Sequence, residues 1–415
     1  MSIPFRLTVM NFMQFFVWGA WLISFGAYMS KALGFTGIQI GSIYGTMGVA
    51  SLFMPGLMGV VADRWLNAER LYGVLHLAGA ALILWASTVR DYQTLYVIML
   101  LNACVYMPTI ALNNAISYRV LEQQGMNFIQ SFPPIRVWGT VGFVIAMWCT
   151  DLSGSTLTTG QLYISAAAAA FLGLYGFTMP VCQPARGEGR RTIAEALGLD
   201  AFILFRRMQM VVFFLCAMML GGALQITNAF GGDFLTDFNA TYPESFGVRH
   251  PILLSSISQM SETLFILTIP FFLQRFGIKV VMLIAIFAWV LRFGLFAYGD
   301  PGPGLWMLVL SMIVYGMAFD FFNISGSMFV NLEANARIRA SAQGLYMVMT
   351  NGLGAFLGTM LAGAVVDHYT VGGVRDWQSI WLAFAGYALV LGLVFPLVFR
   401  YRHDPVEMAA AATAD

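Results

Sequence analysis

Charged side chains are scarce in this sequence. Of its 415 residues, 10% are Asp, Glu, Lys or Arg and 59% are hydrophobic, and the mean hydropathy is +0.76. Because a soluble domain carries about 25% charged residues, water cannot be the main solvent around this chain. The net charge of +1 also leaves no basic field that would attract nucleic acid. We expect a membrane protein that binds no nucleic acid.

Cysteine pairs and catalytic motifs are missing as well. Cys104, Cys149, Cys182 and Cys216 show no CxxC spacing, so they indicate neither a disulfide framework nor a metal site. The sequence has no HExxH, P-loop, nucleophile elbow or paired-carboxylate glycosidase pattern. We therefore expect a protein that is not an enzyme, holds no metal or cofactor, and moves a solute with an ion gradient because no ATP site is present.

Long apolar runs fill the chain instead. Each run has roughly the 20 residues that a helix needs to cross a bilayer, and the first is too long for a signal peptide, so we interpret it as a retained span. The sequence predicts an all-α membrane protein with twelve transmembrane helices. The predicted spans are 8–30, 38–62, 70–89, 93–118, 134–153, 160–180, 208–232, 251–274, 279–299, 304–331, 341–366 and 378–400.

The spans divide into two predicted six-helix halves. The predicted parts are an N-terminal half, a linker, a C-terminal half and a tail, at 1–180, 181–207, 208–402 and 403–415. Most Lys and Arg residues of the loops fall on the side of the N-terminus, and the exceptions are Lys31, Arg90, Arg249 and Arg375. Because basic loops stay in the cytoplasm, we expect the linker and both termini there.

One short motif occurs twice. GVVAD at 59–63 closes the second predicted span, and GAVVD at 363–367 closes the eleventh. Carriers built from inverted three-helix units place equivalent helices at these positions, although a match this short also arises by chance. Gly354, Gly358 and Gly363 are better explained by close helix packing than by ligand contact.

Ionisable residues inside a membrane cost about 2.5–3.5 kcal/mol each and usually line a pathway or pair with one another. Arg136 is one of these residues and begins a helical face in the fifth predicted span. Thr140 and Phe143 follow it at i+4 and i+7, so a guanidinium, a hydroxyl and a ring share one side of the helix. The alternative is that Arg136, a turn inside its span, snorkels to the cytoplasmic interface.

Two neighbouring spans carry polar pairs. Gln225 and Asn228 are three residues apart, as are Gln259 and Glu262, and each pair shares a helical face that would be costly in lipid. We expect these faces to meet a cavity, or else to join helices by interhelical hydrogen bonds. Glu262 is a candidate proton carrier, with a structural partnership to an arginine as the alternative.

The tenth predicted span, MIVYGMAFDFFNISGSMF, is the most informative. Asp320 lies near its middle, Tyr315, Phe319 and Phe322 place aromatic surface on one side, and Asn323 follows one turn after Asp320. An acid and an amide beside aromatic rings suit a ligand with a flat π-system and hydroxyls. The alternative is that the aromatic stripe only packs.

Two further residues have a structural explanation. Arg292, in the ninth span, has no acidic neighbour in sequence and is expected to pair structurally or to snorkel. His76, in the third, could relay protons, but a single histidine among apolar residues is more often a packing residue.

These motifs resemble a known family. GVVADRW resembles the cytoplasmic loop signature of the major facilitator superfamily, without its usual Gly-Arg-Arg continuation. FPPIRVWGTVGF, LQITNAFG, SQMSETLFILTIPFFLQRFGIK and YGMAFDFFNISGS resemble the bacterial nucleoside:proton symporters of that superfamily. The resemblance covers nearly the whole chain, and the loops at 181–191 and 235–250 and the tail after Arg402 diverge.

The resemblance implies a function and a site. It implies a monomer in the bacterial inner membrane that imports purine or pyrimidine nucleosides with protons by alternating access, with proton coupling through Glu262 or Asp320. The implied nucleoside cavity is lined by Arg136, Thr140, Phe143, Gln225, Asn228, Gln259, Glu262, Phe319 and Asp320.

Other functions remain open at this point. A proton-coupled sugar or drug carrier of the same superfamily would not be competed by nucleosides. A membrane enzyme would need polar clusters at the interface, and a nutrient-sensing receptor would usually need a cytoplasmic output domain.

Overall fold

The computed structural model describes residues 2–184, 199–335, 338–399 and 401, and helices dominate it. The first group of helices is α1 (Ile3–Gly19), α2 (Phe25–Lys31), α3 (Gly37–Arg64), α4 (Ala68–Ala86), α5 (Tyr92–Gln123), α6 (Phe128–Leu152) and α7 (Gly160–Gly176). The second group begins with η1 (Leu199–Arg206), α9 (Met208–Asp237), η2 (Phe238–Ala240), α10 (Phe246–Arg249), α11 (Pro251–Ile266), α12 (Ile269–Tyr298) and α13 (Leu305–Glu333). It ends with α14 (Arg339–Met347), η3 (Val348–Gly354), α15 (Ala355–His368), the antiparallel strands β1 (Thr370–Val371) and β2 (Val374–Arg375), and α16 (Trp377–Val398).

Each predicted span coincides with one or more of these helices. Eight helical stretches in the described part of the chain are long and apolar enough to cross a membrane. They lie in α3, α5, α6, α9, α12, α13, α14 to α15, and α16. A multi-span helical membrane protein is confirmed, and crossings by α1, α4, α7 and α11, which would complete twelve, stay a prediction.

One predicted span is divided in the structure, and one predicted boundary between spans is confirmed. The first span is divided between α1 and α2 by a turn at 20–24, although hydrogen bonds such as Phe25 N to Trp21 O carry the chain through it. The eighth and ninth spans meet at Gly277, whose φ of 74° and ψ of 167° only glycine adopts readily. Residues 269–276 therefore belong to the eighth span, and the ninth span begins at Ile278, close to the predicted bounds of 274 and 279.

Side-chain caps start several helices. Thr36 and Gln39 form a capping box at α3, in which Gln39 N donates to Thr36 Oγ1 and Thr36 N donates to Gln39 Oε1. Asp91 accepts a hydrogen bond from Thr94 N at α5, and this bond holds the pKa of the exposed carboxyl below its usual value. Asp376 caps α16 in the same way.

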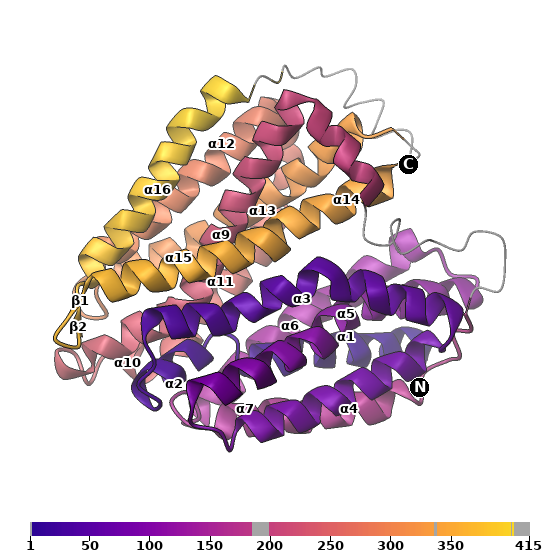
Figure 1. Cartoon of the computed structure of the whole chain (residues 1–415), viewed down its shortest axis with the longest axis horizontal. Coiled ribbons are helices and arrows are strands. Elements are labelled where there is room, and N and C mark those ends of the chain that lie inside the picture. Colours follow the sequence, from indigo (N-terminus) through magenta and orange to yellow (C-terminus); the bar gives the residue numbers. More distant parts are fainter. Residues whose placement is uncertain (1, 185–198, 336–337, 400, 402–415) are drawn as a thin grey trace.

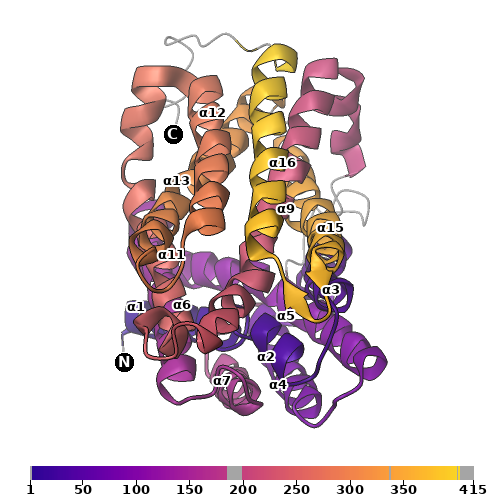
Figure 2. The same cartoon turned by 90° about the vertical axis from the view of Figure 1, so that its left-hand side faces the viewer.

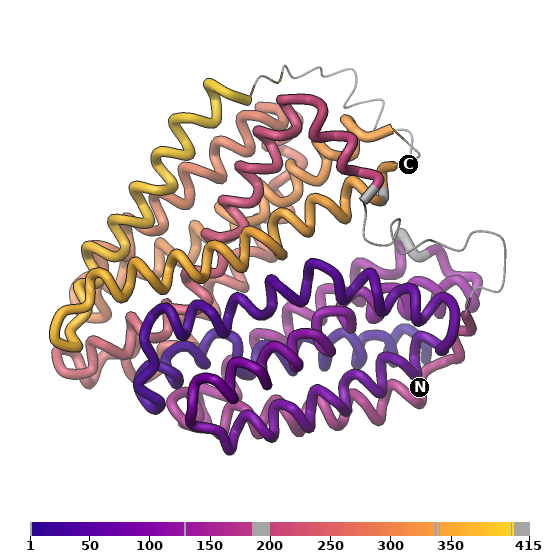
Figure 3. Tube along the Cα trace, in the orientation of Figure 1, coloured from indigo at the N-terminus to yellow at the C-terminus, as the bar shows by residue number. Residues whose placement is uncertain are grey.

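The two groups of helices lie one above the other in Figure 1. They approach each other at the end that holds α2, α10 and the strands β1 and β2, here named the hairpin end, and their ribbons diverge toward the end where α1 begins (Figures 1 and 3). Figure 2 shows α12, α13 and α16 side by side above α2 and α7. Residues 185–198 of the predicted linker lie outside the described residues. The same holds for Arg337, Arg400, Arg402 and the predicted tail 403–415.

A long, close contact between the groups is the antiparallel crossing of α3 and α15. A Cβ on Gly41 would lie 2.1 Å from Thr359 O, and one on Gly363 would lie 2.2 Å from Gly37 O, so only glycine permits this backbone approach. Contacts along the pair reach Leu52, which lies against Gly352. Beyond that point most of α3 is half-exposed or exposed. The packing role predicted for the glycines around 354–363 is confirmed.

Candidate functional site

Four helices bring the predicted site residues together. α6 packs on α11 across the two groups, and α11 also packs on α13 and α9. Gly316 of α13 fixes one of these contacts, because a Cβ there would lie 2.6 Å from Ser261 O and its own N–H donates to Ser261 Oγ at 3.2 Å. Since Glu262 follows Ser261, this tie holds α11 and α13 together beside the predicted acidic pair.

Three charged side chains from both groups interact electrostatically. Arg136 of α6 interacts with Glu262 of α11, and Glu262 interacts in turn with Asp320 of α13. Among the described residues they form no direct ion pair. Asp320 is 3% exposed, and its Oδ2 atom has no hydrogen-bond partner in the described part of the chain. A buried carboxyl oxygen without a partner is available for a ligand or a proton.

The face of α6 follows the predicted pattern. The Arg136 guanidinium lies over the Phe15 ring of α1, 4.2 Å from its centroid, and it interacts electrostatically with Tyr106 as well. Thr140 is half-buried one turn later. Phe143 is buried, edge-on to Trp18 with ring centroids 6.2 Å apart. These contacts direct Arg136 toward α1 and the charged groups instead of toward the lipid headgroups.

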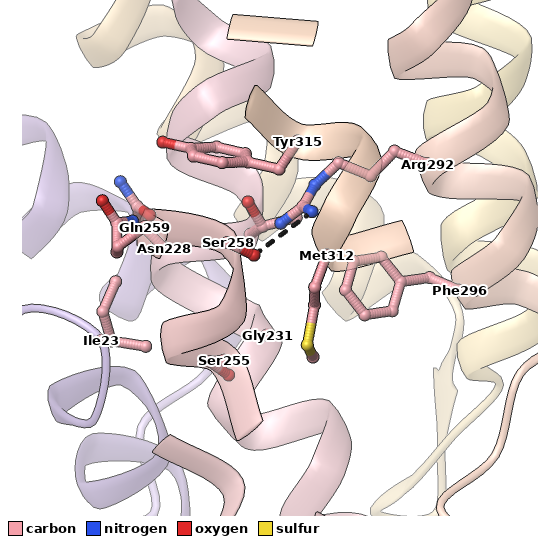
Figure 4. Close-up of a pocket in the computed structure, with 11 residues that line it drawn as sticks. Ile23, Asn228, Gly231, Ser255, Ser258, Gln259, Arg292, Phe296, Met312 and Tyr315 are labelled. Atoms are coloured by element: carbon pink, nitrogen blue, oxygen red, sulfur yellow. Dashed lines mark hydrogen bonds between the residues drawn. The ribbon is translucent and has the colours of Figure 1, made fainter. Parts of the chain in front are cut away.

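The amides of α9 and α11 are half-buried and close to aromatic surface. Asn228 Nδ2 donates to Gln225 Oε1 at 3.2 Å, and the Gln259 side chain is hydrogen-bonded to Tyr315. One pocket is lined by Asn228, Gln259 and Tyr315 (Figure 4). Its other walls come from the turn between α1 and α2 and from α9, α11, α12 and α13. The structure therefore gives part of the predicted site a common cavity.

The aromatic residues of α13 divide into two sets. The rings of Tyr315 and Phe319 are stacked, 6.0 Å between centroids with 9° between planes. Phe322, two turns after Tyr315, packs instead into the core against Phe213 and Phe395. Asn323 is exposed, and its backbone oxygen accepts a hydrogen bond from Tyr346. Phe322 thus has a packing role, while Tyr315 and Phe319 present aromatic faces near the acids.

His76 is a packing residue, as predicted. It is 2% exposed, and its Nε2 atom lies 3.0 Å from Gln14 Oε1, which also accepts a hydrogen bond from Tyr72 at 2.7 Å. Gln14 Nε2 donates to Thr109 Oγ1 at 2.9 Å. The histidine therefore belongs to a satisfied polar network that joins α1, α4 and α5.

Arg292 is only partly as predicted. It does not snorkel, because its side chain is 3% exposed and donates to Ser311 O at 2.8 Å inside the second group of helices. The Ser311 hydroxyl donates back to Arg292 O at 2.9 Å. The residue lines the same pocket as Asn228 and Gln259, and the sequence analysis did not predict this.

An ionic cluster at the hairpin end was also missed. Asp233 and Asp237, one turn apart on α9, pair with Lys31 of α2 and Arg375 of β2, and Trp377 Nε1 donates to Asp237 at 2.5 Å. The available signal was two acids at i and i+4, which share one helical face, together with Lys31 and Arg375 among the four predicted outside cations.

Other hydrogen bonds join the two groups at the same end. Asp367 of α15 accepts from Gly37 N at 2.5 Å and Ile38 N at 2.9 Å, at the first turn of α3. Asp151 of α6 accepts from Ile252 N at 3.2 Å and pairs with His250 at 2.8 Å. In the described part of the chain, the hydrogen bonds found between the two groups lie at the hairpin end.

Comparison with known proteins agrees with this geometry. The family model described as "Nucleoside H+ symporter" matches residues 1–404. The chain is 53% identical to the xanthosine permease of Escherichia coli (strain K12) over 98% of each chain, and 50% identical to the nucleoside permease NupG of the same organism over 97% of each. A crystal structure of the nucleoside transporter NupG superposes with a TM-score of 0.92 at 50% identity, covering 97% of this chain and 100% of that one. The chain belongs to the nucleoside H+ symporter family.

Proposed function

We propose that this protein imports nucleosides together with protons across the bacterial inner membrane by alternating access. The observation that carries the proposal is the electrostatic interaction of Arg136 from the first group of helices with Glu262 from the second. Glu262 interacts in turn with Asp320, next to the stacked rings of Tyr315 and Phe319. Family membership supports the same substrate class.

The proposal assigns the architecture as follows. Twelve helices cross the membrane in two halves, 1–180 and 208–402, which are joined by a cytoplasmic linker, and both termini are cytoplasmic. The unit of transport is the monomer. In this orientation Lys31, Arg249 and Arg375 face the outside, and the presence of Lys31 and Arg375 in one cluster at the hairpin end supports it.

The conformation then faces the cytoplasm. The hairpin end is extracellular, and it is held shut by the ionic cluster of α2, α9 and β2 and by the bonds from Asp367 to the start of α3. The opposite end, where the α3 and α15 contact stops after Leu52, is the open side. Import requires that these extracellular bonds break and re-form once in each cycle.

The nucleoside would be held in the cavity between the halves. Its ribose hydroxyls would bond to Gln225, Asn228, Gln259 and the acids, because carboxylates and amides accept hydroxyl protons. Its base would stack on Phe143 or Phe319, with Arg136 and Thr140 as further polar contacts. These residues are half-buried or buried in the membrane-spanning part of the chain, which supports a site reachable from one side at a time.

Proton coupling would use Glu262 or Asp320. Both carboxyl groups lie in a desolvated site, and the two interact with each other. Protonation of one removes a buried charge and the repulsion between them. The loaded, protonated carrier can then reorient at lower cost than the charged, empty one.

Uptake in cells tests the proposal. Radiolabelled uridine and adenosine are offered to cells that express the protein, with and without a protonophore, against unlabelled nucleosides and sugars as competitors. We expect concentrative uptake that collapses with the protonophore and is competed only by nucleosides. Competition by sugars alone, with the protein shown to be in the membrane, would replace the nucleoside by a sugar as the substrate.

A further inference from the structure

Arg292 is a buried cation without an acidic partner. Its side chain is 3% exposed in the middle of the second group of helices. Among the described residues no Asp or Glu forms an ion pair with it, and the Tyr315 ring lies over its guanidinium. A guanidinium at this depth is costly unless something neutralises it or accepts its protons.

The guanidinium has N–H donors that form no hydrogen bond within the described chain. Of its five N–H groups, those that form hydrogen bonds within the described chain are on Nη1, which donates to Ser311 O at 2.8 Å and to Ser258 Oγ at 3.5 Å. The Nε atom is buried and has no partner in the described residues. A buried donor without an acceptor is destabilising and is retained where a ligand completes it.

Aromatic rings fix the position of the group. The guanidinium carbon lies 4.7 Å from the ring centroid of Tyr315 and 5.2 Å from that of Phe296. Ring faces stabilise the cation, but they do not replace the in-plane acceptors that its N–H groups require. The rings hold the charge in place and leave its hydrogen-bonding capacity open.

The unsatisfied donors belong to the candidate cavity. Arg292 lines one pocket with Ser258, Gln259, Asn228 and Tyr315, and Figure 4 shows its guanidinium beside the Tyr315 ring and bonded to Ser258. Asn228 and Gln259 are among the residues proposed to bind the nucleoside. A nucleoside held by them lies beside Arg292.

We propose that Arg292 is a substrate-binding residue that donates hydrogen bonds to carbonyl oxygens of the nucleobase, so that the carrier prefers bases with exocyclic carbonyls. An arginine only donates, whereas ribose hydroxyls both donate and accept and are served by the amides and acids of the same cavity. Uracil and xanthine offer carbonyl oxygens, and adenine offers none. This inference rests on the proposed nucleoside transport.

A purely structural role makes a different prediction. The reciprocal bonds between Arg292 and Ser311 tie α12 to α13, so loss of the side chain could lower the amount of folded protein. Such a loss would reduce transport of every nucleoside in the same proportion. A change in the ratio between nucleosides requires contact with the base.

The test compares substrates in one set of variants. The substrate concentration that gives half-maximal uptake is measured for uridine, xanthosine and adenosine in the wild type, Arg292→Gln and Arg292→Lys. Transport is normalised to the amount of protein in the membrane. Ser311→Ala removes the hydroxyl tie but keeps the guanidinium. Arg249→Gln removes an exposed arginine that pairs with Glu244 at the hairpin end. Purified protein is tested in parallel for thermal stabilisation by each nucleoside.

For Arg292→Gln we expect half-saturation for uridine and xanthosine to rise by about tenfold or more, the ratio that corresponds to a charge-assisted hydrogen bond. The half-maximal concentration for adenosine should change by less than about twofold. The values for Arg292→Lys should lie between those of the wild type and Arg292→Gln. Ser311→Ala and Arg249→Gln should keep the wild-type ratio between the three nucleosides. If all three nucleosides weaken equally in both arginine variants, the assignment is wrong and the nucleoside function stands. If the wild type neither takes up nor is stabilised by any nucleoside, the proposed function itself is wrong.

Discussion

The α3 and α15 crossing should set how firmly the hairpin end closes, which we propose is the extracellular end, and Gly41→Ala tests this. The new methyl group would lie 2.1 Å from the backbone oxygen of Thr359. Since ordinary contact begins near 3.4 Å, the helices must separate by roughly 1.3 Å or bend, and backbone cannot move aside as a side chain can. Overpacking of this kind costs about 1–3 kcal/mol.

That cost falls on the closed state alone, because the crossing is a contact between the two groups of helices. A penalty of this size shifts the balance between closed and open forms by about 5- to 150-fold. The matched control is Gly386→Ala in α16, where an added Cβ meets no atom within 4 Å. Both changes add one methyl group to a helix, so intrinsic helix propensity is the same in each.

Thiol labelling from outside the cell measures the shift. Ala27 of α2 is buried, and its Cβ faces Gly232 of α9 across the interface. In a background with the four native cysteines changed to serine, Ala27→Cys should react with a membrane-impermeant reagent several-fold faster when combined with Gly41→Ala than with Gly386→Ala. Equal labelling rates in the two backgrounds would refute the claim that this crossing controls closure.

Three further changes have defined outcomes. Asp320→Asn should abolish accumulation of nucleoside against a gradient, and undiminished concentrative uptake would remove Asp320 from proton coupling. Arg375→Met deprives buried Asp233 of its partner at 2.9 Å and leaves Lys31 at 3.6 Å, so thermal denaturation should show a loss of about 3 kcal/mol; an unchanged melting temperature would contradict this. Asp376→Ala should lower the melting temperature at neutral pH. Hydrogen bonds from Ser379 depress the pKa of Asp376, so its contribution is present above the ordinary carboxyl pKa and lost as pH falls through the depressed value; a difference that persists in acid would rule out the cap.

Much of the fold was predictable because membrane spans leave a strong signal in sequence. Long apolar runs located every helix group, and helical spacing placed Gln225 beside Asn228 and Gln259 beside Glu262 on shared faces. The break at Gly277 was predictable, since the eighth predicted span ends at 274 and the ninth begins at 279, and the residue with a φ of 74° lies between them. The turn after Gly19 was not, because the first apolar run continues through it.

Within the site, spacing along one helix was informative and partners on other helices were not. Phe322 shares a side of α13 with Tyr315, yet it packs in the core because α9 and α16 cover α13 at that depth. Arg292 was expected to pair or snorkel, because no local acid is visible in the sequence. Its place beside Ser258 and Tyr315 depends on how α11, α12 and α13 cross, which periodicity does not contain.

The division of charge between the two halves bears on how protons and nucleoside could be coupled. Arg136 belongs to α6 and its electrostatic partner Glu262 to α11, so their attraction links the halves across the cavity. Asp320 lies on the same side as Glu262 and interacts with it electrostatically. A proton on either acid therefore changes an interaction between the halves, and a nucleoside that inserts between Arg136 and the acids changes it again. If the proposed movement of the halves separates Arg136 from Glu262, coupling requires no long pathway, because both ligands act on this one interaction.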